Sequence, residues 1–300
     1  MTEIEAFLTG GDALPDPLHN TLKDMVRRHA SSHPRHLQSR LGPSEVGHPC
    51  LRKLAQGLLF AGHSGNPPDP INPPGDPLPS YIGVAAHSKM EDAAALDNTR
   101  IEAMTGDLGR WITERKVTVR EDLTGTCDLY DTWTNTVIDY KFPGTTAMTQ
   151  YRKDGPSQEY RVQAHLYGAG YLNEGYHVER VAIWFLPRAG QLATSHLWSE
   201  PYDQGIVDAT LAKIDLAVAM LADLDVDRHP ERLALIPRTP KNCSWCPYWS
   251  PIPHPSPAAC QGDSGPVNDT MLVSSEGKLH RETGQGNQSG CSTPQPRKSR

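Results

Sequence analysis

The hydrophobic positions follow two different periods along the chain. Apolar residues at helical spacing predict helices over residues 18–30, 157–173 and 203–224, one or two helices over 80–104, and a short helix within 44–60 that Ser44 could cap. Apolar and polar residues that alternate one by one predict strands over 116–120, 125–131 and 136–142, with a turn at 134–135, and a further strand pair over 178–187 and 191–198.

The remaining sequence divides the chain into three parts. Residues 1–43 hold an N-terminal helix and a linker, residues 44–262 hold nearly all the other predicted elements, and residues 263–300 are rich in Gly, Ser, Asn, Gln and Pro. Because such a composition buries too little apolar surface to offset the entropy lost on ordering, we expect residues 263–300 to form a disordered tail.

Composition and charge limit where in the cell the protein is expected and which partners it can bind. No apolar run in the 300 residues approaches the roughly 20 that span a bilayer, and the N-terminus lacks a signal peptide's pattern, so we expect a cytoplasmic protein with no membrane partner. The net charge of −6 argues against a general polyanion binder. Residues 21–53 nevertheless carry seven Lys and Arg, which suits either a phosphate backbone or a solvated helix and linker.

The residues with the clearest chemistry lie in the segment 125–144. A turn at 134–135 places Asp128 and Asp139 nearly opposite each other on adjacent antiparallel strands, so their carboxylates can converge on one cation. Asp139 and Lys141 are two residues apart and share a strand face. Two carboxylates beside an ammonium group suit phosphodiester hydrolysis with Mg²⁺ or Mn²⁺, because the carboxylates hold the metal and the lysine positions water or stabilises charge. The alternative is a cross-strand ion pair at the surface.

The pattern acidic-x-Lys is a weak signal by itself. It occurs three times, beginning at Glu114, Asp139 and Glu276. Only the occurrence at Asp139 follows another acidic residue across a predicted hairpin, and this context singles it out.

Two predicted helices add polar side chains that can reach the same site. His87 lies on the helix predicted from about residue 81, where its imidazole can complete a metal shell. Gln163 and Tyr167 are four residues apart on another helix, so they share a face that can reach DNA or a metal-bound water. Taken alone, each of these residues is more often structural or exposed.

The six cysteines favour metal ligation or burial over disulfides, because a cytoplasm keeps thiols reduced. Cys243 and Cys246 are close enough to hold one metal centre, Cys260 follows them, and Cys50 is the remaining candidate far upstream. Four thiolates suit a [4Fe–4S] cluster or a tetrahedral Zn²⁺ equally well. Cys127 falls in a predicted strand and is expected in the core.

These motifs resemble those of the RecB-type nucleases of the PD-(D/E)XK superfamily, over about residues 44–262. The order and spacing of His87, Gly125-x-x-Asp128, Asp139-x-Lys141 and Gln163-x-x-x-Tyr167 match that family's metal-binding histidine and its G-x-x-D, D-x-K and Q-x-x-x-Y motifs. The resemblance implies an α/β fold with a restriction-endonuclease-like core, in which helices flank a mixed β-sheet. It implies His87, Asp128 and Asp139 as metal ligands, Lys141, Gln163 and Tyr167 as further catalytic residues, and Glu114 as a supporting acidic residue.

The cysteine pattern resembles the iron–sulfur staple of AddB-type and CRISPR-associated exonucleases. That resemblance implies a [4Fe–4S] cluster held by Cys50, Cys243, Cys246 and Cys260, with Zn²⁺ as the alternative. The interval before Cys260 is longer than is usual in the family, so residues 247–259 look like an insertion, and His48 or His254 could replace a cysteine ligand.

The leading hypothesis is therefore a metal-dependent DNA nuclease. By the resemblance, it is an exonuclease more than an endonuclease, acting on single-stranded DNA in recombination, repair or phage DNA processing, in the host cytoplasm if phage-encoded. The first alternative is a non-catalytic, metal-stapled DNA-binding or scaffold protein on the same fold. The second is a zinc-stapled structural protein with no role in nucleic-acid chemistry.

Overall fold

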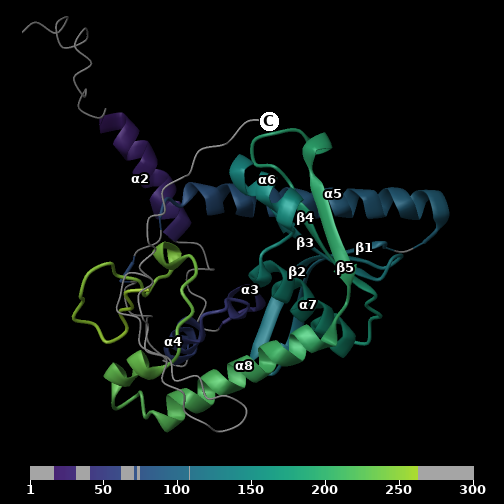
Figure 1. Ribbon diagram of the computed structural model, residues 1–300. Helices are drawn as coiled ribbons and strands as arrows, with labels where there is room; N and C mark the ends of the chain where they lie inside the picture. Colours follow the sequence, from purple (N-terminus) through teal and green to yellow (C-terminus); the bar gives the residue numbers. More distant parts are fainter. Residues whose placement is uncertain (1–16, 32–40, 62–70, 73–74, 108, 263–300) are drawn as a thin grey trace, which may run out of the picture. The chain divides into compact units, whose positions relative to one another are not determined.

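The computed structural model describes residues 17–31, 41–61, 71–72, 75–107 and 109–262 (Figure 1). Its helices are α2 (Pro17–Ser31), α3 (Pro43–Val46), α4 (Leu51–Ala61), α5 (Leu78–Thr105), α6 (Thr145–Asp154), α7 (Gln158–Asn173) and α8 (Gln204–Asp223). Its strands are β1 (Trp111–Arg120), β2 (Leu123–Asp131), β3 (Thr136–Lys141), β4 (Arg180–Phe185) and β5 (His196–Pro201). Short 3-10 turns are η2 (Leu192–Thr194), η3 (Pro230–Leu235) and η4 (Cys243–Trp245).

The strands form one mixed sheet in which neighbours follow the order of the chain, from β1 to β5. The pairs β1–β2, β2–β3 and β4–β5 are antiparallel, whereas β3 and β4 are parallel. A parallel pair needs a crossover connection, and α6 and α7 supply it. The chain is therefore an α/β protein with a mixed five-stranded sheet flanked by helices, as the sequence predicts.

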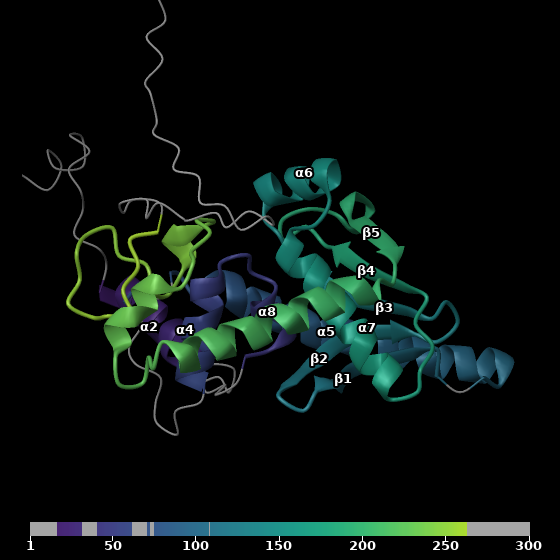
Figure 2. The same cartoon turned by 60° about the horizontal axis from the view of Figure 1, so that its bottom comes forward.

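Helix α7 covers one face of the sheet. Tyr167 and Tyr171 of this helix pack with Tyr130 and Ile183 of the strands, and the rings of Tyr130 and Tyr171 stack with centroids 4.6 Å apart. Helix α8 lies beside α7 on this side, as both views show (Figures 1 and 2). This layer accounts for the nearly complete burial of α7 from residue 162 to residue 171.

Helix α5 packs on the opposite face of the sheet, where Met90 and Ala94 contact a cluster that includes Leu129, Ile138 and Tyr140. Successive residues of a strand point to opposite faces, so β2 and β3 contribute side chains to both layers. The β2–β3 hairpin is thereby fixed between two helices, and this hairpin carries most of the predicted site.

A second core joins the segment around α4 to the end of the described chain. Leu54 and Ala55 of α4 pack in one cluster with Ile214 of α8 and with Leu233 and Ile236. Residues far apart in the sequence therefore share one apolar cluster, which brings the segment after α8 next to the start of α4.

Several local predictions were wrong. Ser44 lies inside α3, whose N-cap is Gly42, and α4 begins at Leu51. The last strand begins at His196, because η2 interrupts the segment that was predicted extended. The sequence does not predict α6, whose single buried residue is Met148, so no apolar face marks it. The predicted tail, residues 263–300, lies outside the described residues.

None of the helices in the described part of the chain is both long enough and apolar enough to cross a membrane.

Candidate metal centre and cysteine pocket

The pairing between β2 and β3 ends where the candidate site begins. The ladder of paired residues ends at Leu129 and Ile138, one position before Asp128 and Asp139. Beyond this point the Tyr140 amide N–H donates to Asp128 Oδ2, at 2.7 Å. The Asp128 carboxylate thus takes the place of a strand carbonyl, and this bond fixes its direction.

Strand β1 is irregular at Glu114, directly beside Asp128. Thr113 pairs with Leu129 and Arg115 pairs with Cys127, whereas Glu114 is skipped and has a left-handed φ of 45°. A left-handed backbone costs a residue with a side chain about 1–2 kcal/mol. Such strain inside a strand is consistent with a functional demand on the direction of the Glu114 carboxylate.

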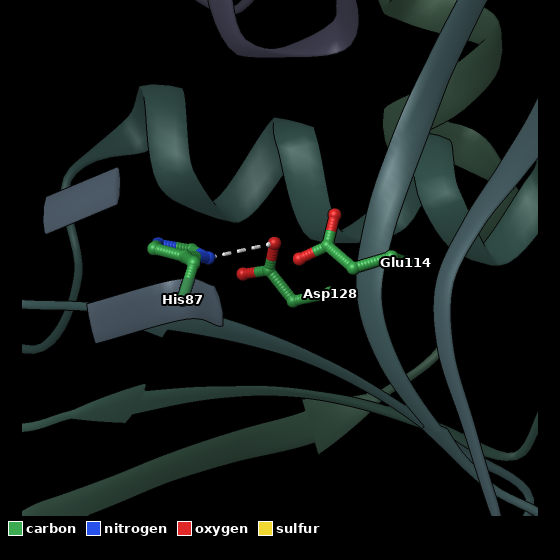
Figure 3. A group of neighbouring side chains, drawn as sticks. All are labelled: His87, Glu114 and Asp128. Carbon is green, nitrogen blue, oxygen red and sulfur yellow. Dashed lines mark ion pairs between the residues drawn. The ribbon is translucent and has the colours of Figure 1, made fainter. Parts of the chain in front are cut away.

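Figure 3 shows the Glu114 carboxylate converging with two other side chains. Ligand atoms of His87, Glu114 and Asp128 all lie within 4.8 Å of one another. His87 comes from α5, where its ring packs against Tyr140 and Phe142, and its Nδ1 lies 3.2 Å from Asp128 Oδ1. Among the described residues this is the one group of three or more His, Cys, Asp or Glu side chains with that spacing.

Asp139 and Lys141 form a second part of the site, on β3. Asp139 is 1% exposed, and Lys141 Nζ lies 2.6 Å from its Oδ2. Burial is the largest influence on the pKa of Asp139 and raises it; Lys141 opposes burial, while the negative charge of Asp128 adds to it. The net effect raises the pKa of Asp139 to about 6.

Gln163 and Tyr167 are buried behind this pair. Gln163 Oε1 accepts a hydrogen bond from Lys141 Nζ at 3.1 Å, and Gln163 Nε2 donates to the Tyr167 hydroxyl at 3.1 Å. Gln163 is 6% exposed and Tyr167 is 5% exposed. The sequence predicts their shared face correctly, but the structure directs that face to Lys141.

The donor set fits a divalent cation. His87 Nδ1 and Asp139 Oδ2 are buried atoms that lack a hydrogen bond of normal geometry, although each lies within ion-pair distance of a charged neighbour. Carboxylates suit Mg²⁺ and Mn²⁺, and an imidazole favours a transition metal. The group of three converging side chains contains Glu114 as its third member, whereas the sequence predicts Asp139 as the ligand beside His87 and Asp128.

The four cysteines assigned to a cluster line one pocket. Cys50 enters it just before α4, Cys243 and Cys246 lie at and after η4, and Cys260 lies near the end of the described chain. Cys127 is fully buried in the sheet, outside this pocket, and burial raises the pKa of its thiol well above the ordinary value. The structure therefore separates the fifth described cysteine from the four.

The distances between these thiols help to decide which metal centre they could hold. A tetrahedral zinc with Zn–S bonds of about 2.3 Å places its sulfurs about 3.8 Å apart. Within the described residues, no three cysteine sulfurs lie within 4.8 Å of one another. Gly262 contributes to the wall of the pocket: it has a left-handed φ of 59°, and an added Cβ would lie 2.8 Å from Cys243 Sγ.

The two histidines proposed as substitute ligands differ in their position relative to the pocket. His48 lines it, but His48 Nδ1 accepts a hydrogen bond from the Cys50 amide, at 3.2 Å. His254 is exposed, does not line the pocket, and accepts a hydrogen bond from the Ser256 amide through Nδ1.

Arg52 belongs to the basic stretch 21–53, but it is buried and so does not fit a contact with a phosphate backbone. It is 8% exposed and donates to the carbonyl oxygens of Ile236 and Ala234, at 2.8 and 2.6 Å. Gln56, one turn further along α4, donates to the carbonyl of Ala258. These side chains tie α4 to the C-terminal segment beside the cysteines.

No protein-family model matches the chain, and no curated protein matches it. Among solved structures it is similar to an alkaline exonuclease from Laribacter hongkongensis, with 11% identity and a TM-score of 0.39 over 67% of this chain and 96% of that one. It is also similar to a phage-related exonuclease from Haemophilus somnus 129PT, with 14% identity and a TM-score of 0.33 over 56% and 77% of the two chains. A structure described as SSO0001 shares 12% identity, with a TM-score of 0.35 over 66% and 85%.

Proposed function

We propose that this chain is a nuclease that hydrolyses phosphodiester bonds of DNA with Mn²⁺ or Mg²⁺. The observation that carries the proposal is the convergence of His87, Glu114 and Asp128 beside the buried Asp139–Lys141 pair. These groups come from four separate elements, α5, β1, β2 and β3. The strained backbone at Glu114 fits a site built to bind an ion. So do the buried atoms of His87 and Asp139 that lack a hydrogen bond of normal geometry, although each has a charged neighbour.

His87, Glu114 and Asp128 would hold the metal, with Asp139 at the base of the site as a further ligand. When bound, the metal would polarise the phosphoryl group and lower the pKa of a water. The mixed imidazole and carboxylate donors favour Mn²⁺ over Mg²⁺.

Lys141 supplies the positive charge that the protein itself places in the site. Its ammonium group lies between Asp139 Oδ2 and Gln163 Oε1, and 4.7 Å from the centre of the Tyr160 ring. Three contacts from different directions restrict the rotamers of Lys141, so its charge can orient a water or offset charge on the phosphate.

Gln163 and Tyr167 act through Lys141 in this proposal. Burial raises the pKa of Tyr167, so its hydroxyl stays protonated and uncharged. The hydroxyl can then accept the bond from Gln163 Nε2, which orients Gln163 Oε1 toward the lysine. Both are positioning residues, because neither contacts the site's open side.

The finer substrate proposal rests on the motifs shared with RecB-type nucleases. We propose single-stranded DNA as the substrate and removal of nucleotides from an end as the mode of cleavage. Such an activity would serve recombination, repair or the processing of phage DNA.

We further propose that Cys50, Cys243, Cys246 and Cys260 hold a [4Fe–4S] cluster. Their convergence on one pocket supports a shared metal centre. No three of their sulfurs lie within 4.8 Å of one another, and a cubane, which holds its four thiolates on four different irons, accepts a larger separation than a single zinc does. The Gly262 amide lies 3.4 Å from Cys260 Sγ and would donate to that thiolate.

The nuclease proposal is tested with anaerobically purified protein and end-labelled single-stranded and double-stranded DNA. Mn²⁺ should support cleavage, EDTA should abolish it, and Asp128→Asn should reduce it by at least about a hundredfold while the protein stays folded. Asp92→Asn is the matched control, because Asp92 lies on the exposed side of α5 in a pair with Lys89. Cleavage by Asp128→Asn at the parental rate would show that the site is wrongly assigned.

A comparison of three variants separates positioning from direct catalysis. Lys141→Ala should lower kcat most, and Gln163→Ala should lower it less. Tyr167→Phe removes the acceptor of the Gln163 bond and should shift kcat with little change in KM. An equal loss for Tyr167→Phe and Lys141→Ala would indicate that Tyr167 contacts the substrate itself.

The cluster proposal is tested by iron, sulfide and zinc analysis of the same preparation. Brown protein with broad visible absorbance and about four irons per chain would support the cluster. Colourless protein with one zinc would overturn the iron–sulfur assignment and keep the shared centre. Colourless protein that contains neither iron nor zinc after this preparation would overturn both.

A further inference from the structure

Two adjoining hollows in the surface form one groove that leads away from the metal site. The inner hollow is lined by His87 and Lys141, and the outer hollow is lined by Trp245. The two hollows share four lining residues, Ala30, Pro79, Ser80 and Arg188. A molecule lying in this groove would therefore pass from the candidate metal ligand His87 to the ring of Trp245.

The groove is cationic within a chain of negative net charge. Among the described residues that line it, three are basic, Lys141, Arg188 and Arg27, and one is acidic, Asp76. Two of the basic groups also have carboxylate partners outside the lining, Asp139 for Lys141 and Asp24 for Arg27. The Asp76 carboxylate already accepts a hydrogen bond from the Leu78 amide, at 2.9 Å. The chain as a whole has a net charge of −6, so this local excess of positive charge fits a polyanion.

Trp245 is 81% exposed although its backbone is held in place. The side-chain amide of Asn72 donates to the carbonyls of Ser244 and Cys246, at 2.7 and 3.0 Å, on either side of Trp245. The Trp245 amide donates to the Asn242 carbonyl at 3.0 Å. The ring therefore contributes little to this chain's own core, and its face is open to a partner that can stack on it.

We infer that Trp245 is a platform on which a nucleobase stacks at the outer end of the groove. The inference rests on the proposed nuclease function. Every base offers a flat face for stacking on an aromatic ring, while the cations along the groove can contact the phosphates. A duplex hides its base faces within the helical stack, so such a platform requires an unpaired strand.

This assignment gives the cysteine-rich segment a second role. Trp245 lies between Cys243 and Cys246, so the pocket that holds the thiols also sets the position of the ring. The segment would then hold substrate as well as join the two ends of the domain.

The test measures binding of fluorescent single-stranded oligonucleotides of increasing length to the full chain in EDTA, where hydrolysis is absent. Trp245→Ala should weaken binding of long strands about five- to a hundredfold, from the usual effect of one stacked base. The loss should be largest for strands long enough to reach from the metal site to Trp245. Trp133→Ala is the matched control, because Trp133 is 52% exposed but lies in the β2–β3 turn outside the groove.

Two further variants distinguish stacking from packing. Trp245→Phe keeps a flat ring and should restore most of the binding, whereas Trp245→Leu keeps apolar bulk and should not. Iron and zinc are measured on each variant, and Phe is compared with Leu at equal metal content. Equal rescue by Leu and Phe would overturn the platform.

The outcomes separate this inference from the proposed function. Parental binding by Trp245→Ala, in a protein whose parent cleaves DNA, overturns the platform alone. Binding that depends on Trp245 without Mn²⁺-dependent cleavage overturns the nuclease proposal alone. A parent that binds no oligonucleotide overturns both.

Discussion

Replacing Asp139 by asparagine tests the electrostatics of the site in the protein without metal. The Asp139 carboxyl is almost completely buried, and its pKa is raised from 3.8 to about 6. One pKa unit corresponds to about 1.4 kcal/mol. The shift therefore disfavours the ionised, folded protein by about 3 kcal/mol, relative to an unfolded chain in which Asp139 is solvated.

The direction of the pH dependence follows from the raised pKa. The folded protein holds the Asp139 proton more tightly than the unfolded chain, so its stability falls as the pH rises from about 4 to about 6. Below this window both states are protonated and the penalty is absent; above it the penalty is complete. Asp139→Asn, which has nearly the same shape and no charge, should raise the free energy of unfolding by up to about 3 kcal/mol at pH 8 and by little at pH 4.

Urea unfolding in EDTA at pH 4, 6 and 8 measures this difference. With Mn²⁺ in place of EDTA, the metal should stabilise the parent more than the variant, because the stabilisation gained from binding to the folded state rises with the logarithm of the affinity. Asp92→Asn, an exposed carboxylate, is the control and should show no such gain. A variant that is no more stable at pH 8 than the parent, or an equal gain in the control, would refute the reasoning.

Three other predictions concern the backbone at Glu114, the cysteine pocket and the packing of α7. Glu114→Gly should be about 1 kcal/mol more stable in urea than Glu114→Gln, because glycine adopts the left-handed φ of 45° without strain, while both should need about tenfold more Mn²⁺ for half-maximal cleavage. Equal stability of the two would contradict the strain. Cys50→Ser should lose iron and lower the Tm by several degrees, which metal analysis and calorimetry detect, and full retention of iron would contradict its role. Gly47→Ala should cost about 1–3 kcal/mol in urea, because the added Cβ would lie 2.9 Å from the Glu159 Cα in α7. Gly83→Ala, whose added Cβ meets nothing within 4 Å, is its control, and a similar loss there would contradict the packing argument.

The hairpin that carries the site can be predicted because its determinants are local. Alternating apolar residues define β2 and β3, and a Thr-Asn pair marks the turn, where Asn135 adopts a left-handed φ of 48°. The order and spacing of the polar residues then place Asp128 and Asp139 side by side. The prediction of these two carboxylates needs no information beyond one hairpin.

The rest of the site depends on contacts that no local pattern encodes. Glu114 lies in a strand that is antiparallel to β2, and its approach to Asp128 depends on an irregular backbone rather than on residue type. The direction in which Tyr167 points is not encoded locally, for a related reason. Helical spacing gives its shared face with Gln163, but only the packing of α7 on the sheet shows that this face is covered.

The cysteine pocket adds to a connection that the protein already makes by hydrogen bonding. Arg52 and Gln56 reach backbone carbonyls near the end of the described chain, and the Arg52 amide donates to the Pro237 carbonyl at 3.1 Å. Buried bonds from a charged donor contribute about 1.5–3 kcal/mol each, so the two ends of the domain can stay joined before any metal binds. The pocket thereby differs from a zinc finger, in which the metal supplies most of the folding free energy. It follows that losing the cluster should weaken the domain without unfolding it, and that the distant carboxylate site can be tested in protein that lacks iron.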